Sequence, residues 1–124
     1  MANAINWFEI PAADFQRAKK FYENIFQMEM TEQPVAGFQM AFFPFDPAGQ
    51  GVSGAICTGE HYTPSTDGAK LYLNGGEDLN NVLNRVQGAG GQVAIPKTQI
   101  TPEYGYMAFF IDTEGNMVGL HSNN

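Results

Sequence analysis

The four residues Met-Ala-Phe-Phe occur twice in this chain, at positions 40–43 and again at positions 107–110. The residues that follow each copy also match, namely Asp46, Gly49 and Val52 after the first and Asp112, Gly115 and Val118 after the second. This ordered set of matches indicates an internal duplication. An apolar aromatic run, a turn with Asp and Gly, and a second apolar run are typical of a β-hairpin. The sequence therefore predicts two hairpins at equivalent places in two half-domains.

The length of the chain is consistent with one domain made of two halves. At 124 residues and 13.6 kDa it can bury a core without disulfides or structural metals. A polar stretch rich in turn-forming residues, about 59–68, separates segments of similar length, about 1–58 and about 69–124. We therefore expect a single domain over residues 1–124, with two repeats joined by this linker.

In the first repeat, the spacing of apolar residues predicts one strand, then a helix, then three strands. Apolar residues recur at three- and four-residue spacing between Phe15 and Phe26, which indicates an amphipathic helix, and Asp14 is its expected N-cap. The predicted strands are 5–10, 28–31, 37–43 and 51–57, with a turn at 44–50.

The second repeat is predicted to follow the same order. Asp78 is the expected cap of a helix, and the glycines within 88–91 are expected to end it. The residues at helical spacing are Leu79, Val82, Leu83 and Val86. The predicted strands are 70–74, 92–95, 104–111 and 117–121, with Gly75 and Gly76 as a break after the first.

The charge and the single cysteine exclude several classes of protein. A net charge of −7 disfavours nucleic acid and anionic membrane surfaces as partners. No apolar run is long enough to span a bilayer, and no secretion signal is visible at the N-terminus. Cys57 is the only cysteine, so an internal disulfide is excluded. We expect a cytoplasmic protein.

Two motifs suggest a family. The first predicted helix carries Asp14, Ala18 and the pair Phe21-Tyr22, and residues 112–116 read Asp-Thr-Glu-Gly-Asn before the last strand. With the duplication, these motifs resemble the glyoxalase/bleomycin-resistance/dioxygenase group, the vicinal oxygen chelate superfamily. The resemblance implies an α+β fold of two tandem βαβββ modules, whose curved mixed sheets form a cup. It also implies a homodimer.

Many enzymes of that superfamily hold a divalent metal in the cup with His and Glu side chains, which suit metals that act as Lewis acids. The resemblance places these ligand positions at Trp7, at Leu71 or Tyr72, and at Gly119. None of these residues is an ordinary metal ligand. The sequence therefore predicts no metal cofactor.

A displaced metal site is the alternative. Glu9 lies two residues after Trp7, and His121 lies two after Gly119. Each therefore shares a strand face with a ligand position whose own residue cannot bind a metal. Two protein ligands hold a metal poorly, since catalytic zinc normally has three. Without a metal, Glu9 is explained as a strand-end charge and His121 as a residue near the chain end. His61, in the linker, is expected at the surface.

The leading hypothesis is a metal-free cup that binds a small molecule. Ten Phe, five Tyr and one Trp exceed what a thin core needs, so some of them are expected to line a cavity. The candidate apolar walls are Trp7, Phe42, Tyr72, Tyr104, Tyr106 and Phe109, and the candidate polar points are Glu9, Asn74 and His121. A slip of one residue in strand register would reverse the faces.

Three functions remain open for such a cup. A binding or sequestering protein, similar to the bleomycin-resistance branch, would hold a cationic planar compound by stacking and charge. An enzyme similar to lactoylglutathione lyase or a dioxygenase, or another lyase or isomerase, would use Glu9 or His121 as a general base. A dimeric scaffold would use its aromatic residues as an interface. No nucleophile motif or phosphate-binding loop is present.

Overall fold

The computed structural model describes residues 3–35, 37–46, 48–49 and 51–124. Positions 47 and 50 of the predicted turn 44–50 lie outside the described residues, as do the first two residues of the first repeat. The first module contains β1 (Trp7–Pro11), α1 (Phe15–Phe26), β2 (Thr31–Val35), β3 (Phe38–Phe42) and β4 (Ser53–Thr58). The second contains β5 (Tyr72–Asn74), α2 (Asn80–Val86), β6 (Gln92–Thr101), β7 (Gly105–Ile111) and β8 (Met117–Ser122).

Each module forms one mixed sheet, and the two sheets have the same topology. The strand orders are β1-β4-β3-β2 in sheet A and β5-β8-β7-β6 in sheet B. The first strand of each module pairs in parallel with the last, and the remaining pairs are antiparallel. The predicted α+β class and the two tandem βαβββ modules are confirmed.

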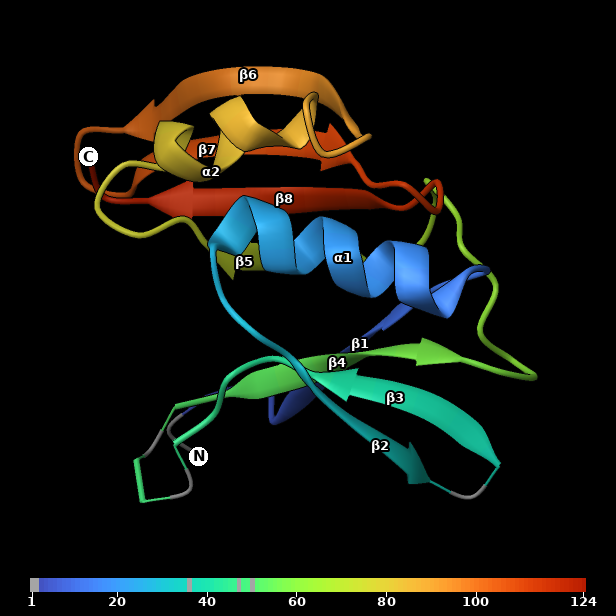
Figure 1. The fold of residues 1–124 in the computed structure, drawn as a ribbon. Coiled ribbons are helices and arrows are strands. Elements are labelled where there is room, and N and C mark those ends of the chain that lie inside the picture. The colour runs from blue at the N-terminus through green and yellow to red at the C-terminus, as the bar shows by residue number, and fades with distance from the viewer. Residues whose placement is uncertain (1–2, 36, 47, 50) are drawn as a thin grey trace.

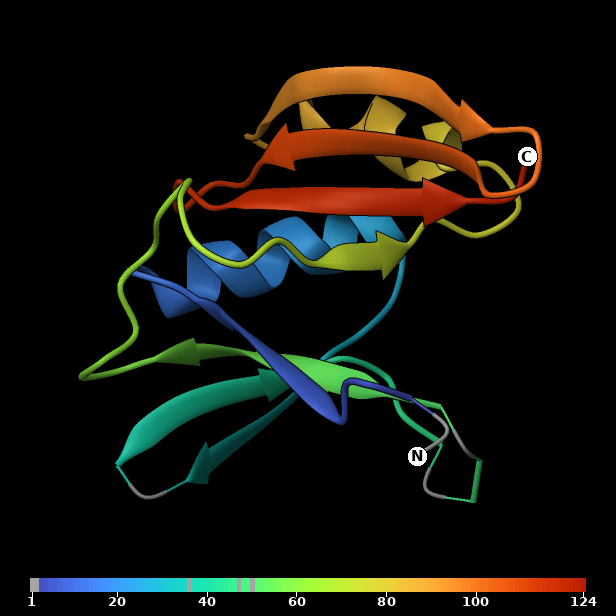
Figure 2. The same cartoon turned by 180° about the vertical axis from the view of Figure 1, so that it is seen from behind.

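The helices lie in the angle between the two sheets (Figures 1 and 2). The apolar residues of both helices and of the strand faces turned toward them form one shared core, which includes Ile10, Tyr22, Ile56, Val86 and Phe110. Burying these faces supplies most of the driving force for folding. Each sheet thus has a face covered by helices and a second face on the outside of that angle. We call the latter the open face.

The duplication is visible in the turns of the two hairpins. In the first, Asp46 accepts hydrogen bonds from Ala48 N to its carboxylate and from Gly49 N to its carbonyl. In the second, Asp112 accepts the same two bonds from Glu114 N and Gly115 N. Asp side chains favour such turns because they bond the backbone two residues on. The repeated Asp and Gly therefore serve the same local function in both modules.

Both predicted helices are present, and their N-termini are capped differently. Asp14 caps α1 as predicted, because its side chain accepts a hydrogen bond from Arg17 N. Asp78 accepts from Asn80 N and so orders the turn that leads into α2, whose own N-cap position is Leu79. Neither helix, as far as the described residues extend, is long and apolar enough to cross a membrane.

Two edge strands differ from the prediction because both contain proline. The strand expected at 28–31 is β2, which begins only at Thr31 and runs through Pro34. The strand expected at 92–95 is β6, which continues through Pro96 to Thr101. β2 and β6 are the outer strands of their sheets. An outer strand has a neighbour on one side only, so a residue without an N–H group, such as proline, is tolerated there.

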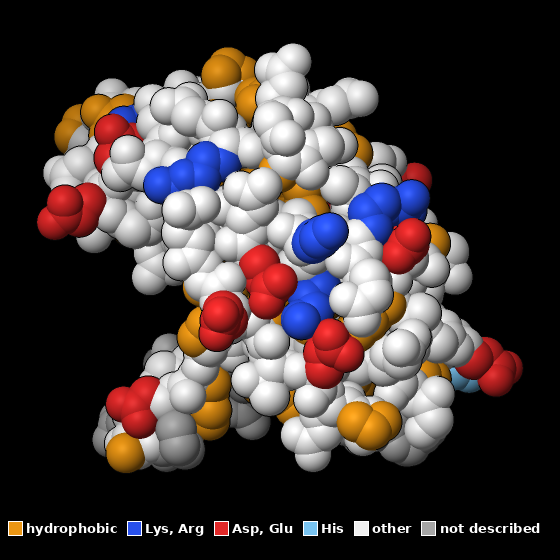
Figure 3. All heavy atoms as spheres, viewed as in Figure 1, with side chains coloured by type: hydrophobic (Ala, Val, Ile, Leu, Met, Phe, Trp, Pro, Cys, Tyr) orange, Lys and Arg blue, Asp and Glu red, His pale blue; other side chains and the backbone are white. Residues whose placement is uncertain are grey.

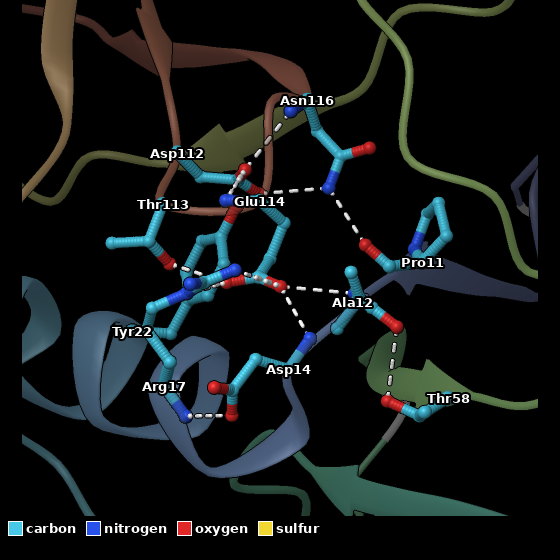
Figure 4. Close-up of polar contacts among 11 residues, drawn as sticks. Pro11, Ala12, Asp14, Arg17, Tyr22, Thr58, Asp112, Thr113, Glu114 and Asn116 are labelled. Atoms are coloured by element: carbon cyan, nitrogen blue, oxygen red, sulfur yellow. Dashed lines mark hydrogen bonds and ion pairs between the residues drawn. The ribbon is translucent and has the colours of Figure 1, made fainter.

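The 112–116 motif joins the two modules (Figure 4). Glu114 accepts hydrogen bonds from the backbone N–H groups of Ala13 and Asp14, at 2.9 and 2.7 Å, just before α1. It also pairs with Arg17 at 2.7 Å. Asn116 donates to the Pro11 carbonyl at 2.7 Å. The second module thus satisfies backbone groups of the first that would otherwise lack partners.

Candidate functional site

The open face of sheet A carries an aromatic pair and a carboxylate. Residues alternate along β1, so Phe8 and Ile10 pack on the core while Trp7 and Glu9 occupy the open face. The Trp7 and Phe42 rings lie edge to face with centroids 5.8 Å apart. Glu9 is two residues from Trp7 on the same strand. The structure therefore brings together three of the predicted site residues on this face.

Tyr62, a linker residue outside the predicted site, lies across the same face. Its hydroxyl donates to Glu9 Oε1 at 2.6 Å, and its ring contacts Phe38 on β3 with centroids 5.4 Å apart. Cys57, on β4 between these strands, is fully buried. Burial, followed by the charge of Glu9, raises the pKa of the Cys57 thiol to about 12. We therefore expect the Cys57 thiol, beneath the open face of sheet A, to be unreactive.

The open face of sheet B carries a second aromatic pair. The Tyr72 and Phe109 rings meet at 5.2 Å in a T-shaped arrangement. Gly119 lies beneath them, since a Cβ at that position would come within 2.7 Å of the Tyr72 ring. The ring thus occupies the space that a side chain at position 119 would need. In the sheet register, Gly119 is the partner of Tyr72 on β5 and of Phe109 on β7.

The two aromatic pairs are equivalent in the duplication. Trp7 and Tyr72 are the first residues of β1 and β5, and Phe42 and Phe109 occupy matching places in the repeated Met-Ala-Phe-Phe segment. The same ring contact has therefore formed at the same place in both modules. Aromatic pairs of this kind stabilise by about 0.5–1.5 kcal/mol beyond their buried area.

Asn74 and His121 also lie on the open face of sheet B. They are register partners on the parallel strands β5 and β8. His121 Nε2 lies 2.7 Å from the carbonyl oxygen of Tyr104, and Asn74 Oδ1 accepts from Gly76 N at 2.9 Å. Both side chains are oriented by backbone groups.

Two predicted site residues are not grouped with the others. Tyr106 is on the covered face, where it packs against the core and Lys97 lies 4.5 Å from its ring centroid. The alternation along β7 could have shown this, because positions 106 and 109 have opposite parity. Tyr104 lies in the turn before β7 with its side chain 62% exposed, and its carbonyl is what reaches His121.

The residues at the family's ligand positions do not fit a metal. Trp7 and Tyr72 form ring contacts, and Gly119 has no room for a carboxylate while Tyr72 stays in place. Glu9 and His121 lie on different sheets and already bond Tyr62 and the Tyr104 carbonyl. Across residues 3–35, 37–46, 48–49 and 51–124, no three His, Cys, Asp or Glu side chains are grouped as metal ligands would be.

Apolar grooves run along the seam between the modules, beside the open faces. One, of about 310 Å³, lies where α1 ends, and it is seen as the hollow at the left of Figure 3. Its lining includes Phe8, Phe26, Met28, Phe43 and Asn74. A second, of about 330 Å³, shares Phe8 and Asn74 and adds Tyr72. Asn74 therefore borders both the grooves and the open face of sheet B.

Comparisons with known proteins agree with this architecture. A sequence model of the Glyoxalase/Bleomycin resistance protein/Dioxygenase superfamily matches residues 4–120. CFP32 of Mycobacterium bovis, whose name assigns it provisionally to the glyoxylases, is 31% identical over 131 residues, which cover 96% of this chain and 45% of CFP32. The chain thus spans about half the length of that relative.

Two solved structures share the fold over nearly their whole lengths. A glyoxalase/bleomycin resistance protein from Albidiferax ferrireducens has a TM-score of 0.74 at 14% identity, covering 98% of this chain and 100% of its own. TnmS3, an antibiotic binding protein from Streptomyces sp. CB03234, has a TM-score of 0.63 at 22% identity, covering 100% and 99%. With the family match over residues 4–120, the chain belongs to the glyoxalase/bleomycin resistance protein/dioxygenase superfamily.

Proposed function

We propose that this protein binds a planar small molecule with a basic group against its aromatic open faces, without a resident metal. The observation that carries the proposal is the pair of equivalent ring contacts, Trp7 with Phe42 and Tyr72 with Phe109, at or beside the positions where the family's enzymes hold metal ligands. Flat apolar rings favour a flat ligand, because stacking and edge contacts both need a planar partner.

The charge of the site favours a cationic group on that ligand. Glu9 is the residue after Trp7 on the open face of β1. One of its carboxylate oxygens accepts a hydrogen bond from the Tyr62 hydroxyl at 2.6 Å. Among the described residues, no N–H or O–H group is hydrogen-bonded to the second oxygen, so we expect a ligand N–H to pair with it. A cation at this point would also face the Trp7 ring. The overall charge of −7 adds attraction at long range.

A second copy of the chain would complete the cup. The open faces lie on the outside of the angle between the sheets, so one cannot close over the other within a chain. Trp7 and Tyr72 remain 41% and 52% exposed there. We propose a homodimer in which sheet A of one copy faces sheet B of the other. TnmS3, an antibiotic binding protein, shows that this fold can serve binding.

The binding test uses the intrinsic fluorescence of Trp7, the only tryptophan. The probes are three compounds with the same acridine ring system, namely cationic 9-aminoacridine, neutral acridine and anionic acridine-9-carboxylate. We expect saturable quenching with the order cation, then neutral, then anion. Phe42→Ala should weaken binding about tenfold, because one buried aromatic contact is worth about 1–2 kcal/mol.

Phe45→Ala is the matched control for that titration. Phe45 belongs to the same module and is 54% exposed, but it lies in the loop after β3 and not in the ring pair. Its replacement should leave all three affinities unchanged. Equal quenching by the three acridines would remove the charge argument, and no saturable quenching by any of them would contradict the proposed function.

Metal content tests the second part of the proposal. Protein purified without a polyhistidine tag should contain well below one equivalent of iron, nickel, manganese or zinc, and none should bind in calorimetric titration. About one equivalent, lost in both Glu9→Gln and His121→Gln, would instead support the displaced Glu9–His121 site and a lyase, isomerase or dioxygenase activity.

A further inference from the structure

Asn74 and His121 stand side by side at the carboxyl ends of two parallel strands. They are register partners in the β5–β8 pair, two residues beyond the partners Tyr72 and Gly119, so all four positions share the open face of sheet B. Two residues of strand advance about 6.6 Å. Asn74 and His121 therefore lie about 6.6 Å along the strands from the Tyr72–Phe109 contact, a separation that one fused ring system can span.

The hydrogen bond of His121 determines which ring nitrogen carries the proton. Nε2 lies 2.7 Å from the carbonyl oxygen of Tyr104. A carbonyl oxygen can only accept, so Nε2 must be the donor, and in the neutral ring Nδ1 is then an acceptor. No described residue hydrogen-bonds Nδ1. His121, on the open face of sheet B, thus keeps an acceptor that no described residue uses.

The hydrogen bond of Asn74 determines the orientation of its amide in the same way. The backbone N–H of Gly76 donates to the side chain at 2.9 Å. Since an N–H can only donate, the bonded atom is Oδ1, and Nδ2 keeps both hydrogens. The described residues include no acceptor bonded to Nδ2, and the side chain is exposed. Asn74 thus offers a donor.

The Gly75-Gly76 break after β5 holds this arrangement in place. Gly76 has a φ of +79°, a conformation that side chains rarely adopt, and this turn directs its N–H to Asn74. Gly75 N donates to the carbonyl of His121 at 2.7 Å, which ties the turn to β8. A donor and an acceptor are therefore presented together by backbone groups, before any ligand binds.

We propose that Asn74 and His121 together recognise the edge of a cis-amide, as found in lactams, imides and ureides. The ligand carbonyl accepts from Asn74 Nδ2, the ligand N–H donates to His121 Nδ1, and the attached ring lies against Tyr72 and Phe109. This inference rests on the proposed function and names a chemical class for one wall of that site.

Other common polar groups match this pair less well. A carboxylate only accepts, so it would face the lone pair of Nδ1 in the neutral His121 ring. An ammonium or guanidinium group only donates, so it would face the N–H groups of Asn74. A bound ligand would shield Asn74 and His121 from water, and a polar group that is buried without a partner costs about 1–3 kcal/mol. A cis-amide edge satisfies both partners at once.

The experiment uses three probes that share one bicyclic ring system. 2-Quinolone has the N–H and the carbonyl, N-methyl-2-quinolone lacks the N–H, and quinoline lacks the carbonyl and has no N–H. We expect 2-quinolone to bind at least about tenfold more tightly than either analogue in NMR titration, as for sites that pair with ligand hydrogen bonds. Long-range ¹H–¹⁵N spectra of the ligand-free protein should show the Nε2–H tautomer of His121.

Asn74→Asp is the sharpest variant, because Asp retains the oxygen that bonds Gly76 N and replaces only the donor with an acceptor. It should weaken 2-quinolone about tenfold or more and leave quinoline, which has no carbonyl to accept from position 74, unchanged. Asn81→Asp, at an exposed position on α2, controls for the added negative charge and should change neither affinity.

Four outcomes would overturn the proposal, and they differ in what else they overturn. An Nδ1–H tautomer of His121, or equal affinity for 2-quinolone and its N-methyl form, removes the cis-amide recognition alone. Binding of acridines without binding of 2-quinolone does the same and leaves the proposed function intact. Failure of both probe sets to bind overturns the proposed function and this inference with it.

Discussion

Gly119 shows how a single residue shapes the open face of sheet B. A Cβ built there would come 2.7 Å from Cδ1 of Tyr72 and 2.9 Å from the carbonyl oxygen of Leu71. The first neighbour is a side chain that can move, but the second is backbone that is hydrogen-bonded to Gly119 N at 2.7 Å. The position therefore requires glycine even though its φ is not in the left-handed region.

Gly119→Ala should lower the free energy of unfolding by about 1–3 kcal/mol, the usual cost of overpacking. It should also displace the Tyr72 ring and weaken planar ligands. Urea denaturation measures the first effect. Gly51→Ala is the matched control, because no atom lies within 4 Å of its added Cβ, and it should be neutral or slightly stabilising. Equal effects of the two changes would contradict the steric argument.

Cys57 gives a second prediction at this scale. Its thiol pKa is raised from 9.0 to about 12, so at pH 8 the thiolate is roughly a thousandfold less populated. Native protein should react with a disulfide reagent far more slowly than unfolded protein. Tyr62→Ala should speed the native reaction by removing the ring that lies across the face, whereas Tyr62→Phe should not. Equal rates for the two variants would show that Tyr62 does not cover Cys57.

The elements are held together by a buried hydrogen bond between α1 and the β7–β8 turn. The Tyr22 hydroxyl, on the buried side of α1, donates to Asp112 Oδ2 at 2.8 Å. Burial, followed by the Asp112 charge, raises the pKa of Tyr22 well above its ordinary value, so the hydroxyl remains a donor. Asp112 also accepts from Asn116, so loss of one donor leaves the carboxylate only partly satisfied.

Tyr22→Phe should destabilise the protein by about 1–3 kcal/mol, because a buried carboxylate loses one partner while the ring packing is retained. Thermal and urea unfolding both report this change. Tyr104→Phe removes a hydroxyl from an exposed side chain and serves as the control, with an expected effect below about 0.5 kcal/mol. A neutral Tyr22→Phe would mean that Asn116 and the Glu114 N–H together satisfy the Asp112 carboxylate.

At the scale of the whole molecule, Glu114 couples the two modules. Its side chain retains no exposed surface, whereas that of its partner Arg17 is 52% exposed. Burial alone would raise the pKa of Glu114, but hydrogen bonds from Arg17 and from the Asp14 backbone outweigh it and hold that pKa below the ordinary 4.5. The folded protein therefore binds a proton at Glu114 less readily than the unfolded chain.

A carboxylate of this kind stabilises the fold above its unfolded pKa, and the contribution is lost as the pH falls through the folded pKa. Glu114→Gln should lower the free energy of unfolding by about 1–3 kcal/mol at neutral pH, with a constant difference down to about pH 5. Below about pH 4.5 the difference should shrink. Glu103→Gln, at an exposed residue, is the control and should show no such pH dependence.

Sequence patterns alone were sufficient for the module architecture. The repeated Met-Ala-Phe-Phe segment with its Asp and Gly predicted two equivalent hairpins, and helical spacing located both helices, because these signals are local and do not depend on the rest of the chain. Strand alternation also grouped Trp7 with Glu9. Edge strands were misjudged, because whether a proline is tolerated depends on the strand's place in the sheet.

The sequence by itself determined the modules and their turns, since local periodicity and duplication encode them. Only the tertiary structure decided which of the aromatic residues share a face, how Tyr62 crosses sheet A, and which atoms of Asn74 and His121 remain available. These features depend on contacts between segments far apart in the chain, such as Tyr104 with His121 and Glu9 with Tyr62. No local pattern specifies such contacts, because they follow from strand register and from the path of the linker.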